Sequence, residues 1–494
     1  MPTVLLPLLQ ALLALSLDGA PVRFGVPLPA TAVGKGLRLE GKGVLQWRRL
    51  PVGGPSADPV WVEVAISAGR GRVAVHAGGA SAHADGRGPA FVREEQEAEE
   101  QYGRRRTETW RWCDGTVDER VRTTFFAATT VNDTTWTAGE SRTVESEGMA
   151  QRMLPLCRLP RDVFERAGLL PPGGRLAAFV QKQLAEHVGR LPELPGARGA
   201  GDFGRSGGVV TNLEFDTTLA VLRCAAAFGD PKALALARRC ARHLIDRDLD
   251  IRTGLPFPHG PDHRTGVPET GHVWLQGVLF AGLFAADDQM LGAAGAIARA
   301  LALHPPIGEG RRERARDHAW PLFEIEAMLA VDPDPRLLLH ADRLAIAIDS
   351  RFDPVARTFC FGEGETDDGV RFERAWVTAG VVIPALRAHL ARCFDGRIAA
   401  HVGAVQQALL DRLDRPLPGV PTHWRVSAGT PFAEHRAIDD PEAVVMLDAF
   451  EPADLRRLLR RDGLRRALDE VLRPDDPDLA TTFTMVGRTR WVWR

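Results

Sequence analysis

Lysine and tyrosine are scarce in this sequence. Among 494 residues, four are lysines and one, Tyr102, is a tyrosine, so nearly all basic side chains are arginines. We attribute this skew to a GC-rich genome rather than to binding sites. The formal net charge is only -2, and the chain therefore lacks the electrostatic footprint of a protein that binds nucleic acid or an anionic membrane. We expect neither as a partner.

Cysteine is also infrequent and scattered. The six cysteines form no CxxC pair and no zinc-like spacing, which excludes a cysteine-based metal centre. Isolated thiols are more often small apolar core residues than members of a disulfide framework. We expect no metal and no other cofactor.

No apolar run is long enough for a confident membrane span, and we expect no membrane insertion. Residues 1–20 hold the most apolar stretch, which suits the central region of a signal peptide. No basic residue precedes it, and the LSLDGA segment is a poor cleavage site. Two interpretations stay open: a signal peptide, with a secreted or periplasmic protein, or a buried first strand, with a cytoplasmic one.

Residues 21–150 show strand chemistry. Segments such as VWVEVAISA, TETWRW and VRTTFFAATTV alternate with period two and are separated by glycine-rich turns. This pattern predicts an antiparallel β domain, built as a sandwich or a barrel. The densely charged run over residues 93–106 indicates a solvated hairpin or edge segment.

Helical spacing dominates the rest of the chain. We expect a helical linker region over residues 151–210 and a helical domain over residues 211–494. Segments that are apolar nearly all round, such as VWLQGVLFAGLFAA, alternate with segments that have one apolar stripe. This alternation predicts inner and outer helix layers, as in an α/α toroid. The fold class is therefore α+β multidomain.

One loop concentrates polar, aromatic and titratable side chains. The stretch PFPHGPDHRTGVPETGHVWLQG contains His259, His263, Glu269, His272 and Trp274, just before and at the start of a predicted inner helix. A loop rich in glycine and proline buries little apolar surface, so such side chains are expected to serve a binding or catalytic purpose.

Several motifs resemble one enzyme family. GDFG, then NLEFD, then HGPDH followed by GHVWLQGVLFAGLF, and then ARDHAWPLF are similar to the toroid of exo-acting rhamnogalacturonan lyases, and APVRFGVPLP is similar to the start of their N-terminal β domain. The resemblance implies a polysaccharide lyase acting on uronate-containing glycans. The chain is shorter than expected if the additional β-sandwich of that family were present.

A lyase needs a base, an acid and a cation that neutralises the uronate carboxylate. Imidazole titrates near neutrality, so four histidines are candidates for base and acid. They are His259, His263, His272 and His318. Arginine can clamp a carboxylate with its planar fork, and the candidates are Arg205, Arg264 and Arg316.

Further side chains are expected to bind an acidic polysaccharide or oligosaccharide in the same cleft. They are Asp202, Asn212, Glu214, Asp216, Glu269, Trp274 and Trp320. The tryptophans would stack on sugar rings, although a tryptophan early in a helix is more often a core residue. A structural role is the alternative for Asn212 and the acidic residues after it: Asn212 would cap the helix, and a carboxylate near the helix N-terminus would stabilise it.

Alternatives to a lyase stay open. Toroid lyases commonly use a tyrosine as the acid, and the helical half has none, so histidine would carry both proton transfers or Tyr102 would reach in from the β domain. The carboxylates fit a glycoside hydrolase instead. A non-catalytic glycan-binding toroid is a third option. A metal site of His259, His263 and His272 is disfavoured, because their spacing matches no helical metal-binding motif.

Overall fold

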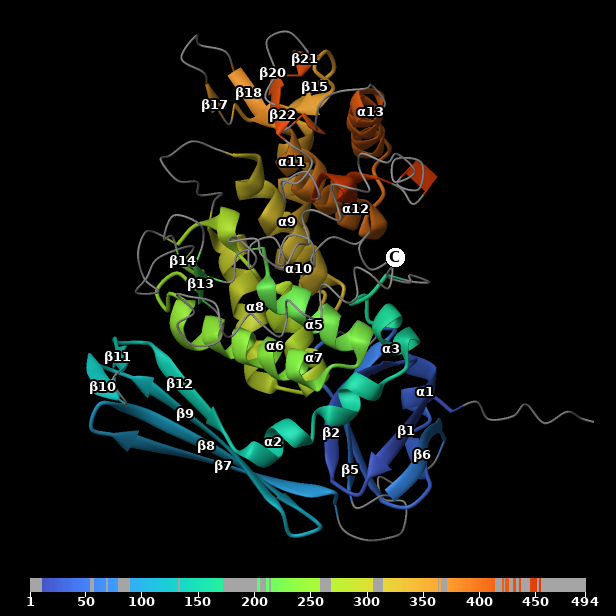
Figure 1. The fold of residues 1–494 in the computed structure, drawn as a ribbon, viewed down its shortest axis with the longest axis vertical. Helices are drawn as coiled ribbons and strands as arrows, with labels where there is room; N and C mark the ends of the chain where they lie inside the picture. Colours follow the sequence, from blue (N-terminus) through green and yellow to red (C-terminus); the bar gives the residue numbers. More distant parts are fainter. Residues whose placement is uncertain are drawn as a thin grey trace, which may run out of the picture.

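The structure is a computed structural model of the full chain. It describes residues 11–53, 57–67, 70–78, 89–131, 134–171, 202–204, 210–212, 215–257, 268–304, 314–362, 364–365, 371–413, 420–421, 423–425, 430–431, 435–436, 445–450 and 453–454. The strand-rich N-terminal part and the helical part that follows form an α+β architecture, with the helices between the N-terminal sheets and a group of short strands (Figure 1).

Two three-stranded antiparallel sheets begin the fold. Their strand orders are β1-β6-β3 and β2-β5-β4. The strands are β1 (Leu13–Asp18), β2 (Val22–Leu28), β3 (Leu37–Glu40), β4 (Val44–Arg49), β5 (Val60–Ser67) and β6 (Arg70–Ala77), with the short helix α1 (Ala30–Gly34) after β2. Strands β2 and β5 are buried along their whole length. Apolar side chains from both sheets share the main hydrophobic core with the helices.

Strand β1 lies in the segment for which a signal peptide and a first strand were both open. Its residues alternate between buried and exposed, as the period of two requires. Leu13, Leu15 and Leu17 are each at most 5% exposed and belong to the main core. Residues 13–18 of this segment thus form a strand of the fold, which pairs with β6 along its whole length.

A long four-stranded antiparallel sheet follows, in the order β12-β9-β8-β7. Its strands are β7 (Phe91–Glu100), β8 (Gly103–Trp112), β9 (Val117–Phe125) and β12 (Ser141–Glu145), and the hairpin β10 (Thr129–Val131) and β11 (Thr134–Trp136) extends from it. The charged run of residues 93–106 forms the β7–β8 hairpin, as expected. Tyr102 lies in its turn and is half exposed.

Helices pair consecutively in the second half. The contacting pairs are α5 (Thr217–Phe228) with α6 (Pro231–His243), α7 (Gln276–Ala285) with α8 (Asp288–Leu303), α9 (Ala315–Leu329) with α10 (Pro335–Asp349), and α12 (Ile383–Arg392) with α13 (Gly396–Leu413). The first members contact one another in sequence, α5 with α7, α7 with α9 and α9 with α12. All residues of α7 are buried, whereas α8 and α10 bury one face. The buried helix α7 is thus followed by α8, which buries one face, and the arrangement of the pairs as inner and outer layers of a toroid stays a prediction.

Aspartates fix where several helices begin. Asp216, Asp230, Asp287 and Asp334 are the N-cap residues of α5, α6, α8 and α10, and each accepts hydrogen bonds from backbone N–H groups of the first turn. These donors have no partner inside the helix, so the caps stabilise the helix starts.

The remaining described elements are short. Between the sheets and the helix pairs lie α2 (Glu147–Gln151), η1 (Leu154–Arg158), α3 (Arg161–Arg166), β13 (Asp202–Gly204) and β14 (Val210–Asn212); η3 (Leu244–Asp248), η4 (Thr270–His272), α11 (Ala375–Val377), η6 (Thr378–Val382) and η8 (Leu447–Ala449) lie among the helices. Short strands also occur where only helices were predicted: β15 (Phe352–Asp353), β16 (Thr358–Phe359), β17 (Gly364–Glu365), β18 (Arg371–Arg374), β19 (Val420–Pro421), β20 (His423–Arg425), β21 (Thr430–Pro431) and β22 (His435–Arg436).

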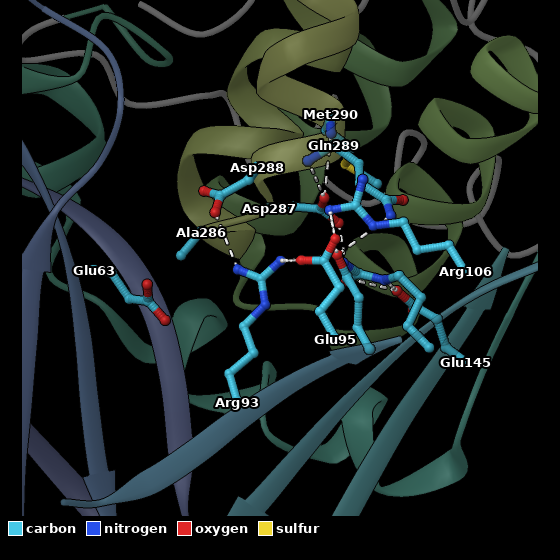
Figure 2. Close-up of polar contacts among 12 residues, drawn as sticks. Glu63, Arg93, Glu95, Arg106, Glu145, Ala286, Asp287, Asp288, Gln289 and Met290 are labelled. Carbon is cyan, nitrogen blue, oxygen red and sulfur yellow. Dashed lines mark hydrogen bonds and ion pairs between the residues drawn. The ribbon is translucent and has the colours of Figure 1, made fainter. Parts of the chain in front are cut away.

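Buried ion pairs join the four-stranded sheet to the helices. The turn between α7 and α8 carries Asp287 and Asp288, which face arginines of the sheet (Figure 2). Arg93 Nη1 lies 3.1 Å from Asp288 Oδ2, and Arg120 Nη2 lies 2.8 Å from Asp287 Oδ2. Asp287 is fully buried and Arg120 is 2% exposed. These two pairs belong to a larger connected set of ion pairs, which we call the arginine clamp. It joins the arginines Arg23, Arg48, Arg93, Arg106, Arg120, Arg238 and Arg242 to the carboxylates Glu63, Glu95, Glu108, Glu145, Asp287 and Asp288.

Candidate functional site

The structure describes part of the predicted site. Arg205, Glu214, His259, His263 and Arg264 lie outside the described residues. The predictions made for them therefore stay predictions.

Asp202 and Asn212 lie in strands rather than in a helix. They are directly paired residues of β13 and β14, so their backbones lie side by side. A shared cleft of these two residues with the histidine loop stays a prediction. Asn212 was considered as a helix cap, but α5 begins only at Thr217, and Asp216 is its N-cap. The capping prediction was therefore wrong in its residue, because the chain first completes a β-pair.

Glu269, His272 and Arg314 form the centre of the candidate site. His272 Nδ1 is hydrogen-bonded to Glu269 Oε1, and Arg314 Nη2 donates to Glu269 Oε2 at 2.8 Å. Arg314 also contacts both carboxylate oxygens of Asp317 in the first turn of α9. The 3₁₀ turn η4 thus brings the predicted loop residues against the start of an inner helix.

Burial and charge set the protonation of this group. Burial alone would raise the pKa of Glu269, but the hydrogen bond from His272 and the positive charges around it lower that pKa to about 2. Burial lowers the pKa of His272, and its bond to Glu269 only partly opposes this effect. At neutral pH we expect an ionised Glu269 and a neutral His272. The proton then sits on Nδ1, leaving Nε2 as the basic nitrogen of the ring.

Arg316 lies beside this group on α9 and is partly buried. Burial lowers the pKa of its guanidinium, and the charge of Arg314 lowers it further. Its Nε atom is buried and has no hydrogen-bond acceptor. His318, two residues onward, is 5% exposed, and its ring centroid lies 5.3 Å from that of Phe361. The structure therefore brings Glu269, His272, Arg316 and His318 to the N-terminal ends of adjacent helical segments.

Asp216 has a structural role in this arrangement. Its side chain accepts from Leu219 N at 3.0 Å and from Gly277 N at 2.8 Å, so it caps α5 and fastens it to α7. Phe215 and Asp216 both have positive φ, 59° and 61°, a conformation that non-glycine residues rarely adopt. This strain is concentrated next to the candidate site.

The two predicted stacking tryptophans are core residues in this structure. Trp274 is 2% exposed and Trp320 is 3% exposed. Their ring centroids lie 5.3 Å apart in an edge-to-face arrangement, and Phe215 stacks on Trp274 at 5.9 Å. Buried rings offer no face to a sugar, so in this arrangement they support the site by packing.

Sequence reasoning missed Arg314 and Asp317. At the start of α9 both the backbone and the guanidinium of Arg314 donate to the Asp317 carboxylate, with Arg314 N donating to Asp317 Oδ2 at 3.0 Å. The signal was present in RARDHAW, where an aspartate stands three residues after an arginine before an apolar run. Only the fold shows that the same arginine also binds Glu269, 45 residues earlier in the chain.

A separate cavity lies where strand β5 and helix α3 meet the helices α5, α7, α9 and α12. It has a volume of about 460 Å³ and includes Trp61, Arg223, Gln276, Phe323 and Glu326 in its lining. This volume lies in the range of small-molecule sites. None of the predicted site residues is among the described residues that line it.

Comparison with known proteins adds no relative: no family model matches the chain, and no curated protein or solved structure is found to be similar to it. In the part of the chain that the structure describes, no three histidine, cysteine or acidic side chains are grouped so as to hold a metal ion. None of the described helices is long and apolar enough to cross a membrane.

Proposed function

We propose that the protein is a carbohydrate-active enzyme, a polysaccharide lyase that cleaves uronate-containing glycans by β-elimination. The proposal rests on the Glu269–His272 pair beside Arg316. His272 would abstract the proton α to the uronate carboxylate and return it to the departing glycosidic oxygen as the C–O bond breaks, while Arg316 would neutralise that carboxylate. Glu269 would orient the imidazole and stabilise its charged form after proton transfer. The paired helices would belong to an α/α toroid with this group at its mouth.

The charges of the cluster favour this chemistry over glycoside hydrolysis. A hydrolase needs one carboxylic acid that is protonated at working pH. Glu269 has its pKa lowered to about 2, Asp317 is paired with Arg314, and Asp216 is occupied by two backbone donors. Glu269 is therefore not suited to be the protonated acid of a hydrolase. The neutral His272 is the group suited to accept a proton.

The reaction can be tested with uronate-containing polysaccharides. A lyase produces an unsaturated uronyl end with new ultraviolet absorbance, whereas a hydrolase produces reducing ends without it. His272→Gln should lower the rate by about 100-fold or more, the usual contribution of a general base. Activity should persist below the ordinary histidine pKa, because burial lowers the pKa of His272.

Matched variants distinguish the roles. Arg316→Gln should raise KM and lower the rate on uronates, while His340→Gln on α10 should change neither, because His340 lies away from Glu269 on an outer helix. Circular dichroism of each variant verifies folding. Full activity of a folded His272→Gln protein, or reducing ends without the chromophore, would contradict the proposal.

A second candidate function is glycan binding without chemistry. The cavity of about 460 Å³ supports it, because Trp61 and Phe323 supply aromatic surface and Gln276 supplies a buried amide group whose Nε2 has no acceptor. Retention on immobilised glycans without product, weakened by Gln276→Leu and unaffected by His272→Gln, would favour this alternative.

A further inference from the structure

A second, much smaller cavity lies inside the arginine clamp. Its volume is about 20 Å³. A water molecule needs about 10–15 Å³ by the same measure, so the cavity holds one water molecule or one single-atom ion. Four arginines line it: Arg23, Arg120, Arg152 and Arg238. Each is at most 8% exposed. Such a concentration of buried positive charge requires compensation.

Among the described residues one carboxylate, that of Asp118, lines this cavity, and its hydrogen-bonding capacity is already used. Asp118 is paired with Arg152, accepts from Trp112 Nε1 at 3.0 Å and accepts from Ser146 Oγ at 3.3 Å. Its charge is therefore matched locally by Arg152. The other three lining arginines belong to the clamp.

Over the described residues the clamp has one more arginine than carboxylates, and the surplus lies among its more exposed members, because the side chains of Arg48 and Arg106 are 40% and 36% exposed. Among the described residues, its connected ion pairs join seven arginines to six carboxylates. The arginines are Arg23, Arg48, Arg93, Arg106, Arg120, Arg238 and Arg242, and the carboxylates are Glu63, Glu95, Glu108, Glu145, Asp287 and Asp288.

Arg238 is the least compensated member. Its one carboxylate partner is Glu145, at 2.7 Å, and Glu145 is shared with Arg120 and Arg242. Burial lowers the pKa of Arg238, and the neighbouring Arg120 and Arg242 lower it further despite Glu145.

Two N–H donors at the cavity wall have no acceptor. Arg238 Nε and Trp110 Nε1 are buried without a hydrogen-bond partner, and both residues line the cavity. Trp110 is 1% exposed. The guanidinium groups of Arg23, Arg93 and Arg120 lie 5.2–5.5 Å from its ring centroid, which makes its surroundings strongly electropositive. An unmet buried donor is costly, and an anion would satisfy both donors at once.

We propose that this cavity binds one monovalent, single-atom anion of the halide class, which is chloride in ordinary solution. The lining, with four arginines against one aspartate among the described residues, favours an anion over a water molecule, and the volume excludes phosphate, sulfate and carboxylates. The ion would accept from Trp110 Nε1 and Arg238 Nε and complete the joint between the sheet and the helices. This site is independent of the proposed lyase reaction.

Thermal unfolding of the full chain tests the proposal. Chloride is titrated against gluconate, which is too large for the cavity, at constant ionic strength. We expect a saturable rise in Tm of about 1–3 °C with chloride or bromide, since a ligand that binds only the folded state stabilises it. Equal Tm values in chloride and gluconate would overturn the proposal.

A matched pair of variants locates the effect. Arg238→Gln removes one positive charge and one donor from the cavity lining, so its Tm should no longer respond to chloride, and its loss of stability should be smaller in gluconate than in chloride. Arg48→Gln changes a clamp arginine that does not line the cavity, and it should keep the chloride response. An unchanged response in folded Arg238→Gln would contradict the assignment.

Bromide diffraction gives a test that needs no variant. Crystals of the unaltered protein grown in bromide should show an anomalous peak between Trp110 and Arg238. A water molecule there, with no anomalous signal, would refute the site even if Arg238→Gln failed to fold.

Discussion

Replacing Asp287 by asparagine tests the arginine clamp most directly. Asp287 is fully buried, is ion-paired with Arg242 and lies 2.8 Å from Arg120. Its carboxylate Oδ1 also accepts from Gln289 N and Met290 N as the N-cap of α8. Asparagine keeps an oxygen for the cap but removes the charge, so the substitution isolates the ionic contribution.

The expected loss is about 3 kcal/mol of the free energy of unfolding. Breaking a buried ion pair from one side costs about 3–5 kcal/mol, because it leaves buried charge uncompensated. The lower end applies because Arg120 keeps Glu108 at 3.1 Å and Glu145 at 2.8 Å. Asp287→Ala should cost about 1 kcal/mol more, since it also removes the cap.

Equilibrium urea unfolding measures this loss as a lower midpoint at unchanged slope. The matched control is Asp230→Asn, which alters the N-cap of α6, where Asp230 accepts from Lys232 N but has no buried arginine partner among the described residues. We expect a change of a few tenths of a kcal/mol there. The reasoning fails if Asp287→Asn costs less than about 1 kcal/mol, or if the two variants lose the same amount.

Three further predictions concern the framework. The pKa of Glu145 is lowered to about 2, because the nearby arginines outweigh the effect of its burial. Its ionised carboxylate therefore stabilises the fold above the ordinary carboxyl pKa, and this contribution is lost as pH falls from about 4.5 to 2. The acid unfolding curves of the unaltered protein and of Glu145→Gln should converge in that range. Leu15→Ala in β1 should cost about 2–5 kcal/mol in urea unfolding, whereas Ser16→Ala on the exposed face should cost almost nothing; equal effects would argue against β1 as a core strand. Gly277→Ala would place a Cβ 2.3 Å from Asp216 Oδ1, so this variant should have a lower Tm. Gly292→Ala has open space around it and should raise the free energy of unfolding by about 0.5–1 kcal/mol. An unchanged Tm of Gly277→Ala would show that α5 and α7 can separate.

Local patterns were sufficient to predict most elements. The alternation of strand segments and the all-round apolarity of VWLQGVLFAGLFAA matched the sheets and the buried helix α7, because both patterns follow from backbone geometry. Helix starts were less well predicted. NLEFD does not open a helix at Asn212, since Asn212 pairs with Asp202 and the cap falls on Asp216.

The clamp was not predictable from periodicity. The charged run over residues 93–106 was expected to be solvated, and many of its residues are exposed. Glu108 and Arg120 lie outside that run, on β8 and β9, and they are buried, because helices α7 and α8 cover that part of the sheet with complementary aspartates. A pair of aspartates after an apolar helix was the one local signal, and by itself it indicates only an N-cap.

The sequence alone determined that a strand-rich part precedes a helical part, that α7 is apolar on all sides, and that titratable residues are concentrated before α7, since each depends on neighbouring residues. Only the tertiary structure decided which charges meet. Arg314 binds Glu269 across 45 residues, and Arg120 binds Asp287 across the junction of sheet and helices. The energy of such pairings depends on burial and distance. A buried charge stabilises the fold when its partner is close and destabilises it when it is unpaired, and no local sequence pattern encodes that distance.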